Sequence, residues 1–255
     1  GMRRWTARHG LALLGAGLLL VALAPRPAVA DEDLSGVWVM TQVTVSEASV
    51  PVVGTIHPVT TVVSLLRLKD DGKRLRGKGD LCQIEVDSGS SFVTTKLPAA
   101  FIRSLPRPQL EAKLDRQDDG TRRLRQAKRT VVVGAKLERP DTDPLPTEPK
   151  DARVIDQDGD GKPGVTVLIE GIVSGEIYVT QRSWTRLSGT QVGREGFAGS
   201  VEFGNEQSIL EATSSMLDDP PDQRPLPDKS WFRMTRLSGD ATCATARAVA
   251  KKWLQ

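Results

Sequence analysis

The chain has 255 residues, which is enough for one or two domains, and a formal net charge of +3. Residues 1–30 carry four arginines and no acidic residue, so residues 31–255 hold 31 basic and 32 acidic side chains. The basic character therefore belongs to the N-terminal segment, which excludes reading it as a nucleic-acid-binding surface. After residue 30 the chain has one histidine, His57, and two cysteines, which excludes His/Cys zinc sites and multi-histidine metal centres.

Residues 1–30 have the three-part pattern of a secretory signal peptide. A basic start, Met2–Trp5, precedes an apolar run from Leu11 to Ala24, and Ala28–Ala30 forms an A-x-A cleavage site. Gly1 precedes this start and is interpreted as an expression scar. The apolar run has about 14 residues, fewer than the roughly 20 of a transmembrane helix. We therefore expect a periplasmic or secreted chain that begins at Asp31 and has no transmembrane span, the alternative being an uncleaved membrane anchor.

The strand signals dominate the rest of the chain. Runs rich in β-branched and aromatic residues alternate with turn signals, of which Asp71-Gly72, Asp119-Gly120 and Gly204-Asn205 favour hairpins. This pattern predicts an all-β fold, an antiparallel barrel or a barrel-like sandwich. The expected strands are Gly36–Val45, Val59–Leu68, Leu81–Val86, Gln109–Leu114, Arg129–Gly134, Val165–Ile169, Gly175–Leu187, Gly196–Phe203, Gln207–Ala212 and Ser230–Leu237.

Helical signals are few. Leu97–Ser104, between prolines, predicts a short helical turn. Ala244–Leu254 is alanine-rich, with Asp240 or Thr242 available as N-cap, and predicts a short C-terminal helix. Its apolar face, which includes Trp253, is expected to dock on the sheet.

Cys82 and Cys243 are expected to form one disulfide. Cys82 lies within the strand-like segment Leu81–Val86, and Cys243 lies near the C-terminus. Two cysteines in an oxidising compartment favour a single bridge. The alternatives are two separate buried thiols or a reactive thiol.

Two proline-rich segments, 139–150 and 218–228, are expected to form exposed, extended loops. The first of them could separate two lobes, 31–138 and 151–255. A single domain over 31–255 is the preferred interpretation, because the expected disulfide would tie the two halves together.

The segment Asp156–Gly164 has the pattern of a calcium-binding loop. Its alternating aspartates would surround one point when the chain coils, and Gly161 would supply the sharp turn. Hard oxygen ligands in this number suit Ca²⁺. The candidate ligands are the carboxylates of Asp156, Asp158 and Asp160, the backbone carbonyl of Lys162, and Gly164.

This segment resembles the first half of an EF-hand calcium loop. It departs from that family at Pro163, where the family has an aliphatic residue, and at Val167, where it has a bidentate glutamate. A strand follows at once, so the loop is similar to the D-x-D-x-D-G loops of exported β proteins. An acidic surface turn without an ion is the alternative. Carboxylates expected as sources of the missing ligand are Asp141, Asp143, Asp151 and Glu170.

Gly36-Val37-Trp38, at the start of the first expected strand, is similar to the Gly-x-Trp signature of lipocalins. The resemblance implies an eight-stranded barrel in which Trp38 closes one end. It also implies a disulfide to the C-terminal segment and an external helix, roles that Cys82, Cys243 and Ala244–Leu254 could fill. A tryptophan in an ordinary β core is the alternative reading.

No catalytic constellation is present in the sequence. His57 lies in a predicted loop and no G-x-S-x-G motif occurs. The basic run Arg122–Arg129 favours a solvated strand face over a surface for anionic membranes or polyanions. We expect a non-enzymatic β-barrel-like protein with a structural Ca²⁺ loop, binding a small apolar ligand or an envelope component. The alternatives are a Ca²⁺-stabilised secreted hydrolase whose acidic residues are unidentified, and a purely structural envelope module.

Overall fold

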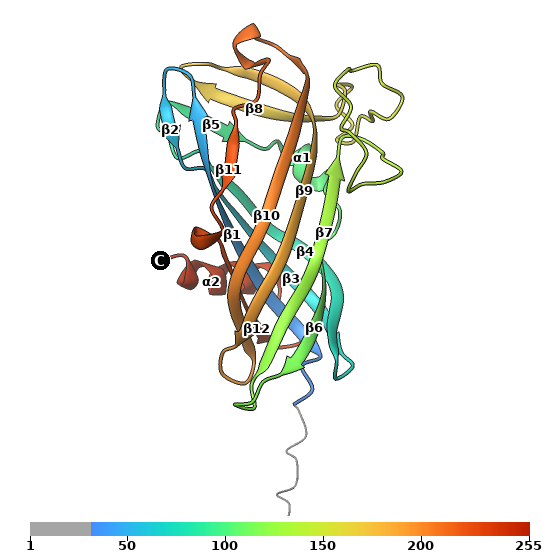
Figure 1. Cartoon of the computed structure of the whole chain (residues 1–255), viewed down its shortest axis with the longest axis vertical. Coiled ribbons are helices and arrows are strands. Elements are labelled where there is room, and N and C mark those ends of the chain that lie inside the picture. Colours follow the sequence, from blue (N-terminus) through green and yellow to red (C-terminus); the bar gives the residue numbers. More distant parts are fainter. Residues whose placement is uncertain (1–31) are drawn as a thin grey trace, which may run out of the picture. The chain divides into compact units, whose positions relative to one another are not determined.

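Eight antiparallel strands pair in a ring in residues 32–255, the part of the chain that the computed structural model describes (Figure 1). Each strand pairs with the next one along the chain, and the last returns to pair with the first. The predicted antiparallel β fold is therefore confirmed, while the predicted signal segment lies outside the described residues. The ring strands are Gly36–Val50 (β1), Val59–Asp70 (β3), Arg74–Asp87 (β4), Gln109–Arg116 (β6), Arg122–Val133 (β7), Gly175–Gln191 (β9), Gly196–Ala212 (β10) and Trp231–Leu237 (β12).

Four shorter strands extend the ring at one end. β8 pairs with the start of β9, β5 pairs with β8, and β2 and β11 pair with the last residues of β1. The remaining elements are Gly54–Ile56 (β2), Val93–Lys96 (β5), Val165–Gly171 (β8), Gln223–Pro225 (β11), the helices Ala99–Ser104 (α1) and Cys243–Trp253 (α2), and the 3-10 turns Ser215–Leu217 (η1) and Pro227–Lys229 (η2). Neither helix of residues 32–255 has the length and the apolar sequence needed to cross a bilayer.

One predicted hairpin turn, Gly204-Asn205, is wrong, because β10 continues straight through it. Gly204 pairs with Trp184 on β9. A Cβ atom at Gly204 would lie 2.3 Å from the indole Nε1 of Trp184. This glycine therefore makes room for a tryptophan on the neighbouring strand, a common use of glycine inside a strand. The Asp71-Gly72 and Asp119-Gly120 turns do form, and both glycines adopt positive φ.

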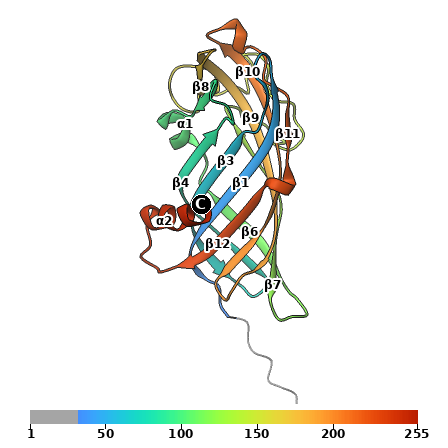
Figure 2. The ribbon, with the colours of Figure 1, turned by 90° about the vertical axis from the view of Figure 1, so that its left-hand side faces the viewer.

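The disulfide between Cys82 and Cys243 joins β4 to α2, as predicted. A register shift in the β3–β4 ladder leaves Cys82 as the extra residue, which directs its side chain to the outside of the ring. Thr242 is the N-cap of α2 and forms a capping box with Thr245. Figure 2 shows α2 lying across the outside of β1, β3 and β4. There Ala246 and Ala250 of α2, with Trp253 beside them, pack on Val37 and Val39 of β1 and on Val63 and Leu65 of β3.

Inside the ring, the half where β1 begins is a filled apolar core. Trp38 is fully buried there, donates its indole N–H to the carbonyl of Leu34 (2.9 Å), and packs against Phe197 at a ring-centroid distance of 6.1 Å. We call this half the closed end. The other buried side chains of this cluster include Met40, Leu66, Leu75, Leu110, Leu124, Leu187, Val201, Phe232 and Met234.

The closed end also contains a buried ion pair between Arg122 and Asp70. Their side chains are each 4% exposed, and Nη1 lies 3.2 Å from Oδ2. Arg122 also donates to the carbonyl of Glu32, and Asp70 accepts from the amide of Leu34. The predicted solvated face for the basic run is therefore wrong at Arg122, because this residue starts the inward-facing set of β7.

The inward-facing residues of the opposite half are half-buried. On β1, β3 and β9 they continue the alternation of the closed-end core, whereas on β4 the extra residue Cys82 changes the inward-facing positions from odd-numbered to even-numbered residues. These positions include Gln42 and Thr44 on β1, Thr60 and Val62 on β3, Ile84 and Val86 on β4, and Gln181 and Ser183 on β9. A separate apolar cluster formed by Phe101 of α1 with β8 and β9 covers part of this half. We call this half the open end.

Most residues of the two proline-rich segments are exposed, as predicted, but both segments also contact the sheet. In the first, Leu145 and Pro146 are buried, and the Pro146 carbonyl accepts a hydrogen bond from the Thr180 hydroxyl. The second contains β11 and η2. Both segments run along the sheet because their apolar residues and backbone groups find partners on the strands.

Candidate metal centre

The loop Asp156–Gly164 lies between β7 and β8 and is closed by its own backbone. The Gly164 amide donates to the Ile155 carbonyl (3.0 Å), and the Gln157 amide donates to the Gly164 carbonyl (3.1 Å). Gly161 adopts φ +82°, a conformation that a glycine takes without the strain of a side chain. The sharp turn predicted at this glycine is therefore present.

Three carboxylates converge inside this loop. One oxygen from each of Asp156, Asp158 and Asp160 lies within 4.8 Å of the others, so the group could hold a metal ion. Backbone amides fix the first of them, because Asp156 accepts from the amides of Asp160 (3.1 Å) and Gly161 (2.9 Å). The alternating aspartates therefore meet as the sequence predicted.

Asp158 has an oxygen that no donor in residues 32–255 satisfies. Its Oδ2 accepts from the amide of Thr166 (2.8 Å), whereas Oδ1 is buried and has no hydrogen-bond partner. Burial raises the pKa of the Asp158 carboxyl, and the charges of Asp160 and Asp156 raise this pKa further. A buried carboxylate oxygen without a donor costs free energy. A cation placed among the three carboxylates would offset that cost.

The residues that position the loop were missed by sequence reasoning. Thr166, at the start of β8, donates its amide to Asp158 and its hydroxyl to Asp160. The Gln157 side chain accepts from the Gly134 amide (2.8 Å) and donates to the Ser104 carbonyl (3.1 Å). These contacts fasten the loop to β7, β8 and the end of α1. The long-range pairing of Gln157 has no signature in the sequence.

The other predicted ligands have mixed outcomes. The Lys162 amide donates to Asp160 (2.8 Å), which places Lys162 beside the carboxylates. The Gly164 carbonyl is engaged in closing the loop, and Val167 is buried in the apolar cluster with Phe101. The four acids expected to supply a further carboxylate each pair with a base instead: Asp141 with Lys128, Asp143 with Arg139, Asp151 with Arg153, and Glu170 with Lys96.

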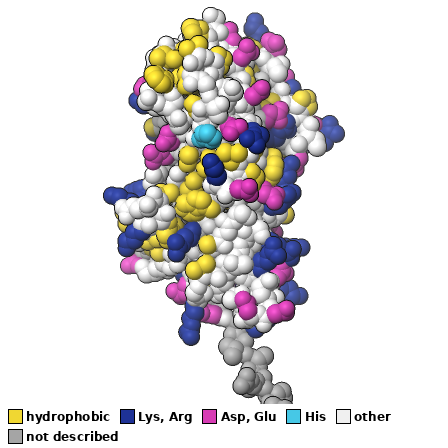
Figure 3. Space-filling model, turned by 60° about the vertical axis from the view of Figure 1, so that its left-hand side comes forward, with side chains coloured by type: hydrophobic (Ala, Val, Ile, Leu, Met, Phe, Trp, Pro, Cys, Tyr) yellow, Lys and Arg dark blue, Asp and Glu magenta, His cyan; other side chains and the backbone are white. Residues whose placement is uncertain are grey.

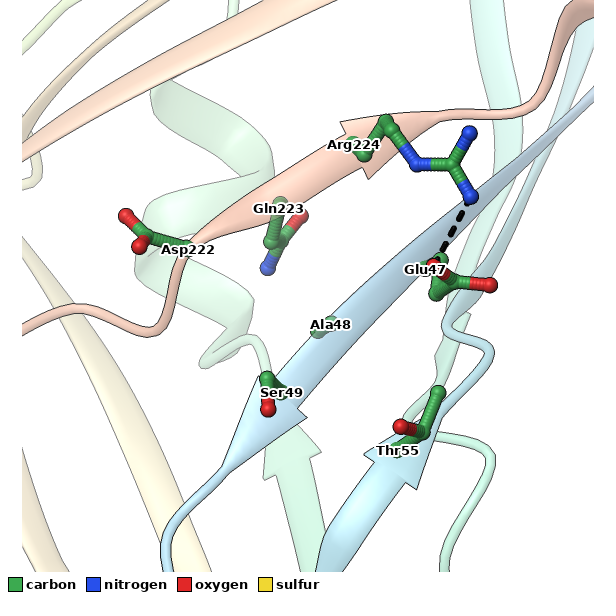
Figure 4. Close-up of a pocket in the computed structure, with 7 residues that line it drawn as sticks. All are labelled: Glu47, Ala48, Ser49, Thr55, Asp222, Gln223 and Arg224. Carbon is green, nitrogen blue, oxygen red and sulfur yellow. Dashed lines mark hydrogen bonds and ion pairs between the residues drawn. The ribbon is translucent and has the colours of Figure 1, made fainter.

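His57 lies outside the metal loop and contacts Glu47, which lines a shallow hollow where β1, β2 and β11 meet (Figure 4). Its Nε2 is 3.5 Å from Glu47, whose other carboxylate oxygen accepts from Arg224 (2.8 Å). The hydrogen bond from Arg224 lowers the pKa of Glu47 below its usual value. His57 therefore belongs to an exposed charged cluster.

No family model, curated protein or solved structure matches this chain. Its function must therefore be inferred from the chemistry of its own residues.

Proposed function

We propose that this chain is an exported, non-enzymatic β-barrel protein that carries a structural Ca²⁺ ion and holds a small apolar ligand. The observation that carries the metal proposal is the buried Asp158 Oδ1, which lacks a donor and lies among three carboxylates. Export is supported by the signal pattern of residues 1–30 and by the disulfide.

Ca²⁺ fits the donor set better than other common metals. The donors are three carboxylates, and within residues 32–255 the group contains no histidine or cysteine. Hard oxygen ligands of this kind suit Ca²⁺, which also tolerates irregular geometry and completes its shell with water. Mg²⁺ demands a stricter octahedron and holds its water more tightly.

The ion would act as a structural clamp. The loop is fastened to β8 through Thr166, and to β7 and α1 through Gln157. A filled site would therefore hold three elements of the open end together. Strands flank the loop, so no helix pair is available for the opening motion of an EF-hand sensor.

Asp158→Asn is expected to abolish stabilisation by Ca²⁺ while making the metal-free protein more stable. A group whose folded pKa is raised loses stability as pH rises through that pKa, so the ionised Asp158 destabilises the metal-free fold near neutral pH. A neutral amide removes this cost. Saturating Ca²⁺ at about 100 times Kd should stabilise the wild type by about 2.7 kcal/mol, which corresponds to roughly 5–10 °C in Tm.

The measurement is thermal unfolding in EDTA and then in Ca²⁺, with Mg²⁺ as the ion control. Asp118→Asn, in the hairpin turn between β6 and β7, serves as the matched variant and should keep the full Ca²⁺ response. An equal Ca²⁺ response in wild type and Asp158→Asn would contradict the site.

The proposal of an apolar ligand rests on the half-buried inward positions of the open end. Val62, Ile84 and Val86 face inward there without being fully covered. The strand ring, the disulfide to the C-terminal segment and the external helix support the resemblance to lipocalins that Gly36-Val37-Trp38 suggested. Barrels of this kind hold small ligands at their open end.

Val62→Trp is expected to weaken binding of an apolar ligand at least about tenfold, because the larger ring would occupy the inward space of the open end. Binding can be measured by titration with a fluorescent naphthylamine probe and its displacement by a fatty acid. Thr61→Trp places the same ring on the outward side of β3 and should leave affinity unchanged. Equal losses in both variants would place the ligand outside the barrel.

A further inference from the structure

Four turns at the open end of the barrel carry no charge, unlike the β7–β8 connection, which contains the acidic metal loop. Four segments there contain neither acidic nor basic residues, although a quarter of the chain is charged. The turns of the closed end are rich in charge, as in Lys69–Arg74 and Asp115–Arg123. Figures 1 and 2 place the two groups of turns at opposite ends of the strands. The uncharged segments are 49–56, 88–95, 171–175 and 212–217.

Each of these uncharged turns exposes one large apolar side chain. Val52 is 97% exposed, Met216 is 72% exposed, and Phe92 and Ile172 are each 58% exposed. Three of the turns are joined by hydrogen bonds. Ile172 donates its amide to the Phe92 carbonyl, and Thr213, three residues before Met216, donates its amide to the carbonyl of Glu176 at the start of β9 and accepts from the Glu176 amide. Figure 3 shows hydrophobic side chains gathered at this end of the molecule. We call these four residues the apolar tips.

Val52 is held in a conformation that valine avoids. Its φ is +70°, and in residues 32–255 no other residue apart from glycine has a positive φ. A β-branched side chain in this region is strained, and such turn positions favour glycine or asparagine. Val52 is therefore strained and fully exposed at the same time, and neither property contributes to the stability of the fold. Local strain of this kind is typical of functional positions.

We propose that the apolar tips dock this end of the barrel into the interfacial region of a lipid bilayer. Protein interfaces have a polar rim, and salt bridges commonly set their register. These turns offer no charged side chain for such salt bridges, and their serines and threonines suit the head-group layer. Charged residues begin directly behind the tips and are mostly acidic: Asp87, Lys96, Glu170, Glu176, Glu211 and Asp218. Because these acidic side chains would be repelled by anionic lipids, we expect the tips to prefer a zwitterionic bilayer surface.

The docking can be measured by co-sedimentation of residues 31–255 with phosphatidylcholine vesicles. Residues 32–255 form one compact unit, and removing 1–30 excludes the separate apolar run of that segment. The wild type should bind, with no loss at high salt and no gain on adding anionic lipid. The double variant Val52→Asp, Met216→Asp should lose at least about tenfold in partition coefficient. Val192 is an exposed apolar residue between β9 and β10 at the closed end, so the control variant Val192→Asp should bind like the wild type.

Val52→Asn separates docking from folding. Asparagine relieves the strained φ and removes an apolar tip, so the variant should unfold at an equal or higher temperature and bind vesicles more weakly. Absence of binding by the wild type, or equal binding by Val52→Asp, Met216→Asp, would overturn the proposal. Sedimentation equilibrium without lipid tests the rival occupant: a dimer that the double variant abolishes would assign the apolar tips to a second copy of the chain. The metal and apolar-ligand proposals are tested independently of the docking proposal, because their experiments contain no vesicles.

Discussion

Replacing Arg122 with alanine is expected to lower the free energy of unfolding by about 3–5 kcal/mol. Arg122 and Asp70 form the buried ion pair of the closed end, with each side chain only 4% exposed. Arg122 also satisfies the Glu32 carbonyl (2.8 Å). Its removal would leave the Asp70 carboxylate buried without its counter-charge, and only the backbone amides of Leu34 and Gly72 would then offset the desolvation cost. Chemical denaturation monitored by tryptophan fluorescence measures the change.

The neighbouring arginine on β7 provides the matched control. Arg125 pairs with Asp115 on the outside of the barrel, where the two side chains are 51% and 42% exposed. Arg125→Ala should cost at most about 1 kcal/mol, because solvent screens the pair. The double variant Arg122→Met, Asp70→Leu should recover much of the lost stability, since it removes both charges. Equal losses in the free energy of unfolding for Arg122→Ala and Arg125→Ala would contradict the expectation that the buried pair contributes more than the exposed one.

Loss of the disulfide has the second large expected effect. Cys82 and Cys243 are 161 residues apart in the chain, so their bond restricts the unfolded state strongly. The chain-entropy relation gives a loss of about 5 kcal/mol for the Cys82→Ser, Cys243→Ser variant. The folded barrel should persist, because α2 keeps its apolar contacts through Ala246 and Ala250.

Urea unfolding of the oxidised protein, the reduced protein and the double-serine variant tests this expectation. The reduced wild type should match the variant, and both should show a steeper dependence on urea, because an uncrosslinked chain exposes more surface. Trp253→Ala removes a contact of α2 while keeping the disulfide and should cost less than the double variant. A double-serine variant as stable as the oxidised protein would contradict the prediction.

Several features were determined by the sequence because they depend on neighbouring residues. The Asp71-Gly72 and Asp119-Gly120 turns need only a glycine that accepts positive φ. The loop Asp156–Gly164 coils its carboxylates together through its own spacing. The start of α2 depends on the capping side chain of Thr242. Each of these is a short-range effect and could be read without knowing the fold.

Other features were decided by the tertiary structure, because the residue on the opposite strand sets them. In the sequence Gly204 looks like a turn glycine, but it lies within β10, opposite Trp184 of β9, whose indole occupies the space of a Cβ atom. In the sequence Arg122 looks like any other residue of the basic run, but the register of β7 directs its side chain toward Asp70 inside the barrel. The burial that leaves Asp158 Oδ1 without a donor, and the gathering of four uncharged turns at one end, follow from strand pairing across long sequence distances. Side-chain direction in a strand reverses with every residue, so register decides which side chains meet, and local sequence does not contain that register.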